Sequence, residues 1–233
     1  MTASQIHTVA VVGGTGPQGR GLAYRLTRGG HDVVLGSRDA DRATAAADEL
    51  AERLTERLTE RLIGAGSITG AANADACAKA EIVLLAVPYD GHDALVEQLR
   101  EPLAGKIVIS CVNPLGFDQH GPFGLDVAAG SAAEAAAALL PESVVVGAFH
   151  HLSAVTLITD DELHEDVLVC ADDRDAAEVV AGLAEAVTGR HGVYAGRLRL
   201  ARQLEPLTAV LISVNKVHKI HSGIHVTGLP RPA

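Results

Sequence analysis

The chain has 233 residues and is acidic, because 29 Asp and Glu against 19 Lys and Arg give a net charge of -10. Hydrophobic residues make up 48% and aromatic residues only 3%, which is the composition of a globular protein able to bury a sizeable core. An acidic chain of this kind argues against nucleic acid as the main partner, since binding to a phosphate backbone needs a basic surface.

The sequence also argues against a membrane or secreted protein. No stretch approaches the ~18 apolar residues of a membrane span, and the first residues lack the pattern of a signal peptide. Cys77, Cys111 and Cys170 are odd in number and far apart, which is typical of buried thiols in a reducing compartment. We therefore expect a cytoplasmic protein.

Charge is unevenly distributed along the chain. Residues 190–233 carry a net charge of +6, which leaves -16 for the residues before them. A basic end on an acidic protein is either a solvated face or a binding place for an anionic ligand. The basic residues of this segment are Arg190, Arg197, Arg199, Arg202, Lys216, Lys219 and Arg231.

In chain order, short β-branched runs alternate with Ala-rich helical stretches, which predicts a parallel sheet with helices on both faces. We expect strands at 7–13, 32–36, 81–87, 106–112, 143–149 and 166–171. Helical segments are expected within 19–30, 71–80, 91–100, 131–140 and 174–187. The fold class is α/β, a Rossmann-type doubly wound sheet.

The chain changes character after the last predicted strand. A long apolar helix is expected to begin with Pro206 in its first turn and to end before Gly223. We therefore expect a nucleotide-binding domain over residues 1–155 and a small, largely helical C-terminal lobe over residues 156–233.

A small ERLT repeat places Leu50, Leu54, Leu58 and Leu62 four residues apart. Such a stripe creeps by ~40° at each step around a helix. This predicts a long solvated helix with one buried edge rather than a coiled coil, which needs alternating spacings of three and four.

A glycine-rich turn follows the first predicted strand and opens a helix. Its spacing is G-x-G-x-x-G, which is typical of a dinucleotide site because the glycines allow a tight turn, close approach of a pyrophosphate and packing of helix on strand. The residues are Gly14, Thr15, Gly16, Pro17, Gln18 and Gly19.

The tip of the second strand indicates which dinucleotide binds. An NAD-binding chain is expected to have an acid there, but this chain has Gly36, Ser37 and Arg38, with Arg42 nearby. A hydroxyl and two guanidinium groups favour a 2'-phosphate, so we expect NADP(H). The alternative is that Arg38 is a surface residue capped by Asp39.

The reaction site of a doubly wound sheet lies beyond the carboxyl ends of its strands. Val87 and Pro88 follow one strand there, and Asn113 either bonds to a ligand or merely begins an Asn-Pro turn. His150 and His151 are adjacent at another strand end, so at most one of them meets a given ligand.

A metal site and a hydrolase are both disfavoured. His218, His221 and His225 have a helical spacing, but Gly223 should end the helix between them, and we expect no metal. No G-x-S-x-G elbow is present. The catalytic residue stays open, with His150 expected to position the ligand rather than to transfer protons.

Three stretches occur in order over nearly the whole chain: VVGGTGPQGRGLAYRLTRGGHDVVLGSRDADRA, AFHHLSA and VHKIHSGIHVTGL. Together they resemble the NADPH-dependent coenzyme F420 reductases, also called F420H2:NADP oxidoreductases. The resemblance implies a Rossmann domain, a small C-terminal lobe, and hydride exchanged directly between NADP(H) and the 5-deazaflavin of coenzyme F420, stacked between the two.

The resemblance also implies roles for single residues. Those at the pyrophosphate would be Thr15, Gly16, Pro17 and Gln18, and those at the 2'-phosphate would be Ser37, Arg38 and Arg42. The ring junction would be lined by His150, Leu152 and Ala154, with Gly228 and Leu229 closing the deazaflavin pocket. Where some members have Lys and Pro, this chain has Arg42 and Ser153.

Hydride transfer between two bound rings needs contact and exclusion of water but no protein acid at the reacting carbon. The basic C-terminal segment, with Arg197, Arg199 and Arg202, would offset repulsion of the anionic deazaflavin tail. Two alternatives stay open: an NADP-dependent imine or keto-acid reductase and a non-catalytic NADP-sensing regulator. The apolar C-terminal helix favours a homodimer.

Overall fold

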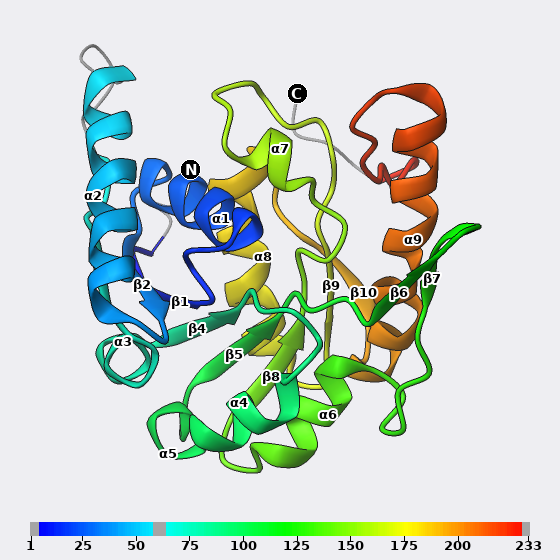
Figure 1. Ribbon diagram of the computed structural model, residues 1–233, viewed down its shortest axis with the longest axis horizontal. Helices are drawn as coiled ribbons and strands as arrows, with labels where there is room; N and C mark the ends of the chain where they lie inside the picture. Colours follow the sequence, from blue (N-terminus) through cyan, green and yellow to red (C-terminus); the bar gives the residue numbers. More distant parts are fainter. Residues whose placement is uncertain (1–4, 58–63, 230–233) are drawn as a thin grey trace.

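The computed structural model describes residues 5–57 and 64–229. Its centre is an eight-stranded sheet in the order β10-β9-β8-β5-β4-β1-β2-β3 (Figure 1). All neighbouring strands are parallel except β8 and β9, which are antiparallel. The strands are β1 (Thr8–Val12), β2 (Asp32–Ser37), β3 (Ile68–Ala72), β4 (Ile82–Leu85), β5 (Ile107–Ser110), β8 (Val144–Gly147), β9 (Leu168–Ala171) and β10 (Val193–Gly196).

Helices cover both faces of the sheet, and a two-stranded hairpin lies apart from it. The hairpin is formed by β6 (Leu115–Asp118) and β7 (Gly121–Gly124). The helices are α1 (Pro17–Arg28), α2 (Ala40–Arg57), α3 (Asn73–Lys79), α4 (His92–Gln98), α5 (Arg100–Leu103), α6 (Ala132–Leu139), α7 (Ala154–Leu157), α8 (Arg174–Thr188), α9 (Ala201–His218) and the 3-10 turn η1 (Leu198–Leu200).

The hydrophobic core forms two layers, one on each face, because side chains alternate along every strand. In β1, Val9 and Val11 face the layer under α1, α2 and α8, while Ala10 and Val12 face the layer under α3, α4 and α6. The near-continuous apolar strands that the sequence shows are what a sheet buried on both faces requires.

The six strands expected from the sequence are all present, and the prediction of a Rossmann-type α/β fold is confirmed. The sequence reading missed β3, β6, β7 and β10. These strands are short, and the sequences ITGAA and VYAG have small residues where buried strands normally have branched ones. The edge strands β3 and β10 pair with β2 and β9, whereas β6 and β7 pair with each other in the separate hairpin.

The expected start of the C-terminal helix is wrong. The helix α9 begins at Ala201, so Pro206 lies inside it rather than in its first turn. The turn η1 leads directly into α9, where Ala201 packs in the core. The buried carboxylate of Glu205 accepts hydrogen bonds from the backbone amides of Ala132 and Ala133 and so fixes α9 against the start of α6. The helix ends at His218, before Gly223 as predicted, and Lys219 follows in a left-handed conformation with φ 56°.

The sheet continues past residue 155, since β9 and β10 belong to it. The division of the chain at residue 155 stays a prediction; η1 and α9 are helical, whereas residues 219–229 contain no helix or strand. In α2, Leu50 and Leu54 are buried and form the predicted edge; Leu58 and Leu62 lie outside the described residues. In the described parts, no helix is both long and apolar enough to cross a membrane.

Candidate cofactor site

The turn between β1 and α1 is built from closely packed glycines. Gly13 has φ +76°, and a Cβ there would lie 2.5 Å from the carbonyl oxygen of Ala86. A Cβ on Gly19 would lie 2.7 Å from the carbonyl oxygen of Gly13, and one on Gly14 would meet Leu35 at 2.5 Å. The glycine with a left-handed backbone conformation is therefore Gly13, which directly precedes Gly14, the first glycine of the G-x-G-x-x-G pattern.

Gly16 has a different environment from Gly14 and Gly19. A Cβ on Gly16 would meet only the carbonyl oxygen of Gly13, at 3.4 Å, so the space above it is open. The first amides of α1 follow directly and have no partner within the helix. An open backbone at a helix N-terminus is suited to a phosphate, whereas Gly14 and Gly19 line neither of the two pockets described below.

A cavity of about 610 Å³ lies over the tip of β2. It brings together the three residues predicted to choose the nucleotide, Ser37, Arg38 and Arg42. A Cβ on Gly36 would lie 2.8 Å from Oδ1 of Asn73, so a larger residue there would displace this side chain at the cavity. The other lining residues are Gly13, Thr15, Gly16, Asp39, Asn73, Ala86, Val87, Pro88, Asp90, Gly91, Ala94, Leu95 and Gln98.

Asp39, which follows Arg38 in sequence, uses its carboxylate to cap a helix. The carboxylate of Asp39 accepts hydrogen bonds from the backbone amides of Asp41 (3.0 Å) and Arg42 (3.2 Å) and so caps α2. Within the described part of the chain, neither Arg38 nor Arg42 makes an ion pair. Both guanidinium groups are therefore available to an anion in this cavity.

A second cavity, of about 470 Å³, adjoins the first and shares Gly16, Ala86, Val87 and Pro88 with it. Its walls come from α1, from the ends of β4, β5 and β8, and from α9. Its other lining residues are Pro17, Gln18, Tyr89, Cys111, Asn113, His150, His151, Leu152, Ser153, Ala154, Thr208, Leu211, Ile212 and Asn215.

Two successive carbonyls after β8 are fixed by side chains from three other elements. The amide of Asn113 and the hydroxyl of Thr208 both donate to the carbonyl oxygen of His150, at 2.8 Å and 3.1 Å. The amide of Gln18 donates to the carbonyl oxygen of Phe149 at 3.5 Å. Phe149 has φ 64°, a rare value for an aromatic residue that is maintained here by its surroundings.

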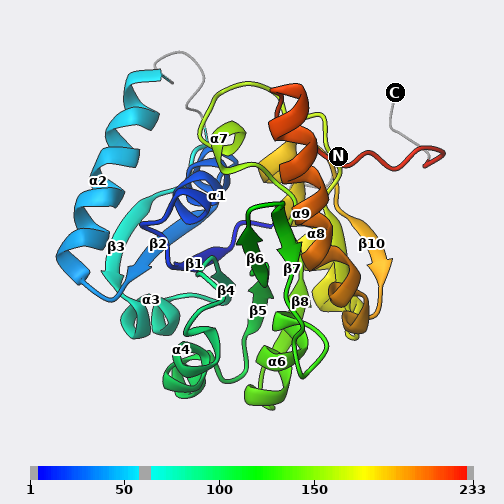
Figure 2. The ribbon, with the colours of Figure 1, turned by 45° about the vertical axis from the view of Figure 1, so that its right-hand side comes forward.

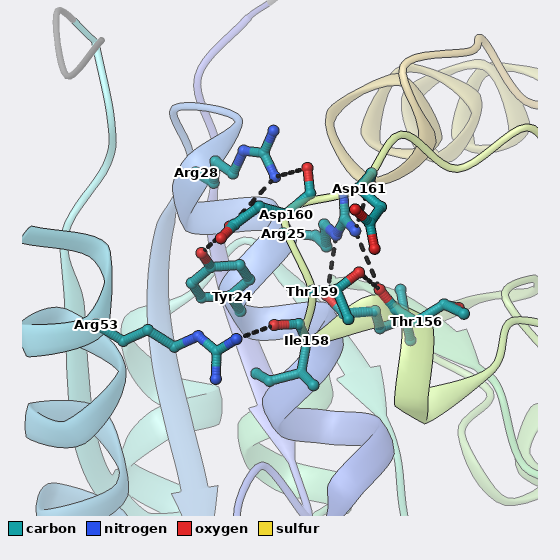
Figure 3. Close-up of polar contacts among 10 residues, drawn as sticks. Tyr24, Arg25, Arg28, Arg53, Thr156, Ile158, Thr159, Asp160 and Asp161 are labelled. Atoms are coloured by element: carbon teal, nitrogen blue, oxygen red, sulfur yellow. Dashed lines mark hydrogen bonds and ion pairs between the residues drawn. The ribbon is translucent and has the colours of Figure 1, made fainter. Parts of the chain in front are cut away.

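Polar groups from α1 and α2 fasten the segment around α7, whose first residue borders the second cavity (Figure 3). The buried guanidinium of Arg25 donates to the carbonyl oxygens of Leu157 (2.9 Å), Thr156 (3.0 Å) and Asp161 (2.9 Å). Arg53 donates to Ile158, and Tyr24 to Asp160. The wall at Ser153 and Ala154 is thus tied to the helix that begins at the glycine-rich turn.

The ionisable groups that line the second cavity are not suited to proton transfer near neutral pH. Burial lowers the pKa of His150 to about 3, with a smaller contribution from His151. Burial also lowers the pKa of His151, whose Nε2–H donates to the carbonyl of Asp166 at 2.7 Å. Burial raises the pKa of Cys111 to about 12, and it also raises the pKa of Tyr89.

The structure thus brings most of the predicted residues into two adjoining cavities, but not all of them. Leu229 borders a separate cavity near Arg25 and Arg28, and Gly228 lines none of the three cavities described. The contact of these two residues with a deazaflavin stays a prediction. The turn after α9 lies closer, because His221 Nδ1 is 3.4 Å from Ser153 Oγ.

The three spaced histidines do not share a helical face, because α9 ends at His218. In residues 5–57 and 64–229, no group of three or more His, Cys, Asp or Glu is arranged to hold a metal ion.

Fold and cavities together define a Rossmann-type dinucleotide-binding protein. Residues 8–114 match the family model of coenzyme F420-dependent NADP oxidoreductases. The chain is 37% identical to an F420-dependent NADP reductase of Methanothermobacter thermautotrophicus, over 95% of each chain. It is 36% identical to one of Methanocaldococcus jannaschii, over 95% of this chain and 98% of that one. The chain belongs to the F420-dependent NADP reductase family.

A solved structure from Arthrobacter sp. FB24, assigned as an F420-dependent NADP reductase, matches with a TM-score of 0.76 and 28% identity, covering 95% of this chain and 99% of that one. More distant structures, such as a pyrroline-5-carboxylate reductase of Coxiella burnetii at 14% identity and a TM-score of 0.57, share the fold.

Proposed function

We propose that the protein transfers hydride reversibly between NADP(H) and the 5-deazaflavin of coenzyme F420. The observation that carries this proposal is the pair of adjoining cavities, one with free cations at the tip of β2 and one enclosed by α9. The names of its relatives support the same pair of substrates.

The first cavity would hold the adenosine end of NADP(H). Ser37, Arg38 and Arg42 would bind the 2'-phosphate through charge-assisted hydrogen bonds. The open backbone over Gly16 would accept the pyrophosphate, with Thr15, Pro17 and Gln18 alongside. Val87 and Pro88, which border both cavities, would guide the nucleotide toward the second.

When bound, the nicotinamide and the deazaflavin supply the hydride donor and acceptor, so the protein has to orient the rings and exclude water. Leu152, Leu211 and Ile212 give the second cavity an apolar wall. The hydrogen bonds from Asn113 and Thr208 fix the backbone from which His150, Leu152 and Ala154 extend. His150 stays neutral at physiological pH and positions the rings by contact.

The lack of a suitable proton donor among the described residues at the second cavity disfavours an imine or keto-acid reductase. Such an enzyme usually supplies a proton donor to the reacting heteroatom. Tyr24 is buried in α1 and donates to Asp160, and the pKa of Tyr89 is raised further by burial. Hydride exchange between two rings does not need a proton donor of this kind. The other alternative, an NADP sensor, would bind NADPH without turnover.

The experiment that tests the function is anaerobic stopped-flow absorbance of the protein mixed with NADPH and oxidised coenzyme F420. We expect rapid bleaching of the deazaflavin with NADPH, and far slower bleaching with NADH. FMN in place of F420 serves as the acceptor control. Tight NADPH binding without any bleaching would overturn the proposal in favour of a small-substrate reductase or a sensor.

We also propose that the protein is located in the cytoplasm and that it forms a homodimer. The three free, buried cysteines are compatible with a reducing compartment. For the dimer, β7 packs against α9 (Figure 2), and both elements expose apolar side chains. The exposed apolar residues of α9 are Val210 and Val217, the latter 72% exposed. Those of the hairpin are Phe123 in β7, Phe117 in β6, which is 68% exposed, and Leu125 just after β7. Exposed apolar surface of this kind marks interaction sites.

We propose a second copy of the chain as the partner, because Val210 and Val217 lie on the side of α9 opposite the residues that line the second cavity. A symmetric contact would cover this side and leave the cavity open. Light scattering should show a dimer for the native protein and a monomer for V210D/V217D, with NADPH affinity retained. A native monomer at micromolar concentration would contradict the dimer.

A further inference from the structure

The end of α9 places positive charge at the rim of the second cavity. Thr208, Leu211, Ile212 and Asn215 line that cavity, and their spacing of three and four residues defines one side of the helix. At 100° per residue, positions 216 and 218 flank this side, so Lys216 borders it and lies away from the side of Val217. Lys219 is the first residue after α9, where the chain turns with φ 56°, and its backbone amide donates to the carbonyl oxygen of Asn215.

The contacts of the following turn support this placement. The backbone amide of Ser222 donates to Oδ1 of Asn215 at 2.6 Å, and His221 Nδ1 lies 3.4 Å from Oγ of Ser153. Asn215 and Ser153 both line the second cavity. The turn is thus folded back over the rim, with His221 beside the wall at α7.

None of these side chains has an acidic partner in the part of the chain that the structure describes. Lys216, Lys219 and His221 are exposed, and in the described residues none of them makes an ion pair. Arg202, at the other end of α9, is paired with Glu134 at 2.5 Å. Arg197 and Arg199 belong to the η1 region and line neither cofactor cavity.

We infer that Lys216 and Lys219, with His221 beside them, form a subsite for the anionic tail of the deazaflavin, which carries a phosphodiester and glutamyl carboxylates. This inference rests on the proposed function. It narrows the expectation from the sequence, in which the whole basic C-terminal segment, with Arg197, Arg199 and Arg202, offsets repulsion of the tail. In a protein with net charge -10, a local cluster of unpaired cations lowers the electrostatic cost of bringing such a substrate to the cavity.

A simpler role for the same residues is to complement the negative end of the helix dipole. That role would stabilise α9 but would not distinguish between substrates. The two roles therefore differ in a measurable way: a tail subsite affects only a deazaflavin that has a tail, whereas a dipole effect changes stability and both deazaflavins alike.

The test compares K216Q/K219Q with the matched variant R197Q/R199Q, which removes the same charge away from the cavities. Each is assayed with coenzyme F420 and with the tail-less deazaflavin, which has the same ring and ribityl group. For K216Q/K219Q we expect KM for F420 to rise about five-fold at low salt, and less at high salt because the charges are screened. KM for the tail-less compound, the Kd for NADPH and the Tm should stay unchanged.

The inference is overturned if R197Q/R199Q gives the larger effect, if both deazaflavins weaken equally, or if only the Tm falls. Failure of the native protein to turn over either deazaflavin would instead refute the proposed function, and the tail subsite with it. Turnover of both compounds with equal KM by native protein and variants would refute the subsite alone.

Discussion

At the tip of β2, the choice of nucleotide depends on which charges are free. Asp39 is acidic and borders the cavity, but its carboxylate caps α2 by accepting two backbone amides. Arg38 and Arg42 keep their charge available. A 2'-phosphate would therefore meet two guanidinium groups, and the acid at the same corner is already neutralised in part by the helix N-terminus.

Replacing Arg38 by Ala should weaken NADPH binding by roughly 10-fold or more, because a hydrogen bond to a charged group contributes about 1.5–3 kcal/mol. NADH binding should hardly change, since NADH lacks the 2'-phosphate. Fluorescence titration of both nucleotides measures this, with Arg100→Ala, an exposed residue outside both cavities, as the control. Equal weakening of NADPH and NADH would contradict the assignment.

The sequence predicts those parts of the site that depend on local geometry. The glycine turn and the tip of β2 follow from neighbouring residues, and the structure places Gly16, Ser37 and Arg38 in the cavities as expected. Thr208 and Asn215 were missed, although the spacing of the cavity-lining residues in α9 is helical. That signal does not say which side of a helix meets a ligand, because this depends on long-range packing.

At the scale of elements, the position of α7 depends on polar bonds more than on its own sequence. The helix has four residues, too few to be stable alone. Arg25 of α1, which is 4% exposed, holds three carbonyls in and around α7, as Figure 3 shows. The wall of the second cavity at Ala154 is therefore positioned from α1.

Arg25→Met should lower the free energy of unfolding by about 3 kcal/mol, because it leaves buried carbonyls without donors. Arg28→Met is the matched control: Arg28 is partly exposed and contacts Asp160 at 3.3 Å and 3.7 Å, so its loss should cost less than about 1 kcal/mol. Urea denaturation measures both. Equal stability of the two variants would show that the three bonds of Arg25 contribute little.

The segment after α9 packs against a buried carboxyl group, Glu165, which is in direct contact with Gly223. Burial raises the pKa of Glu165 to about 7, although the charge of Arg25 opposes this shift. Because the pKa in the folded state lies above that of the unfolded chain, the folded protein holds the proton more tightly. Stability from this group is present below about pH 4.5 and is lost as the pH rises toward 7.

Glu165→Gln should therefore flatten the dependence of Tm on pH. The variant should match the native protein near pH 5 and exceed it near pH 8, because Gln cannot ionise. Differential scanning fluorimetry across this range gives the comparison, with the exposed neighbour Glu162→Gln as the control. A native Tm advantage that grows from pH 5 to pH 8 would show that the ionised carboxylate is favourable in the fold.

The elements that the sequence did not predict have a common physical reason. The strand β3 and the hairpin β6–β7 contain glycine and few branched apolar residues, so neither periodicity nor propensity marks them. Each forms because another element is beside it: β2 pairs with β3, and α9 packs on β7. Such strands depend on the assembled fold and leave little local signal.

For the whole molecule, the decisive feature is that the two cavities share a wall. Gly16 and residues 86–88 border both, so a nucleotide in the first reaches the second without a change of fold. The segment that follows residue 155 completes both the sheet and the second cavity, through β9, β10 and α9. A reaction between two bound molecules is thus possible within one chain.

This arrangement predicts a sequential mechanism in which both substrates are bound before hydride moves. All three cysteines are free and buried, with pKa values raised to about 11 or 12, so they are poorly suited to store reducing equivalents between two half-reactions. Initial rates with NADPH and F420 both varied should give intersecting reciprocal plots. Deuterium from NADPH labelled at both C4 positions should appear on the deazaflavin without exchange into water. Parallel plots, or loss of the label to solvent, would mean that a carrier on the protein intervenes and that the shared wall does not bring the two rings together.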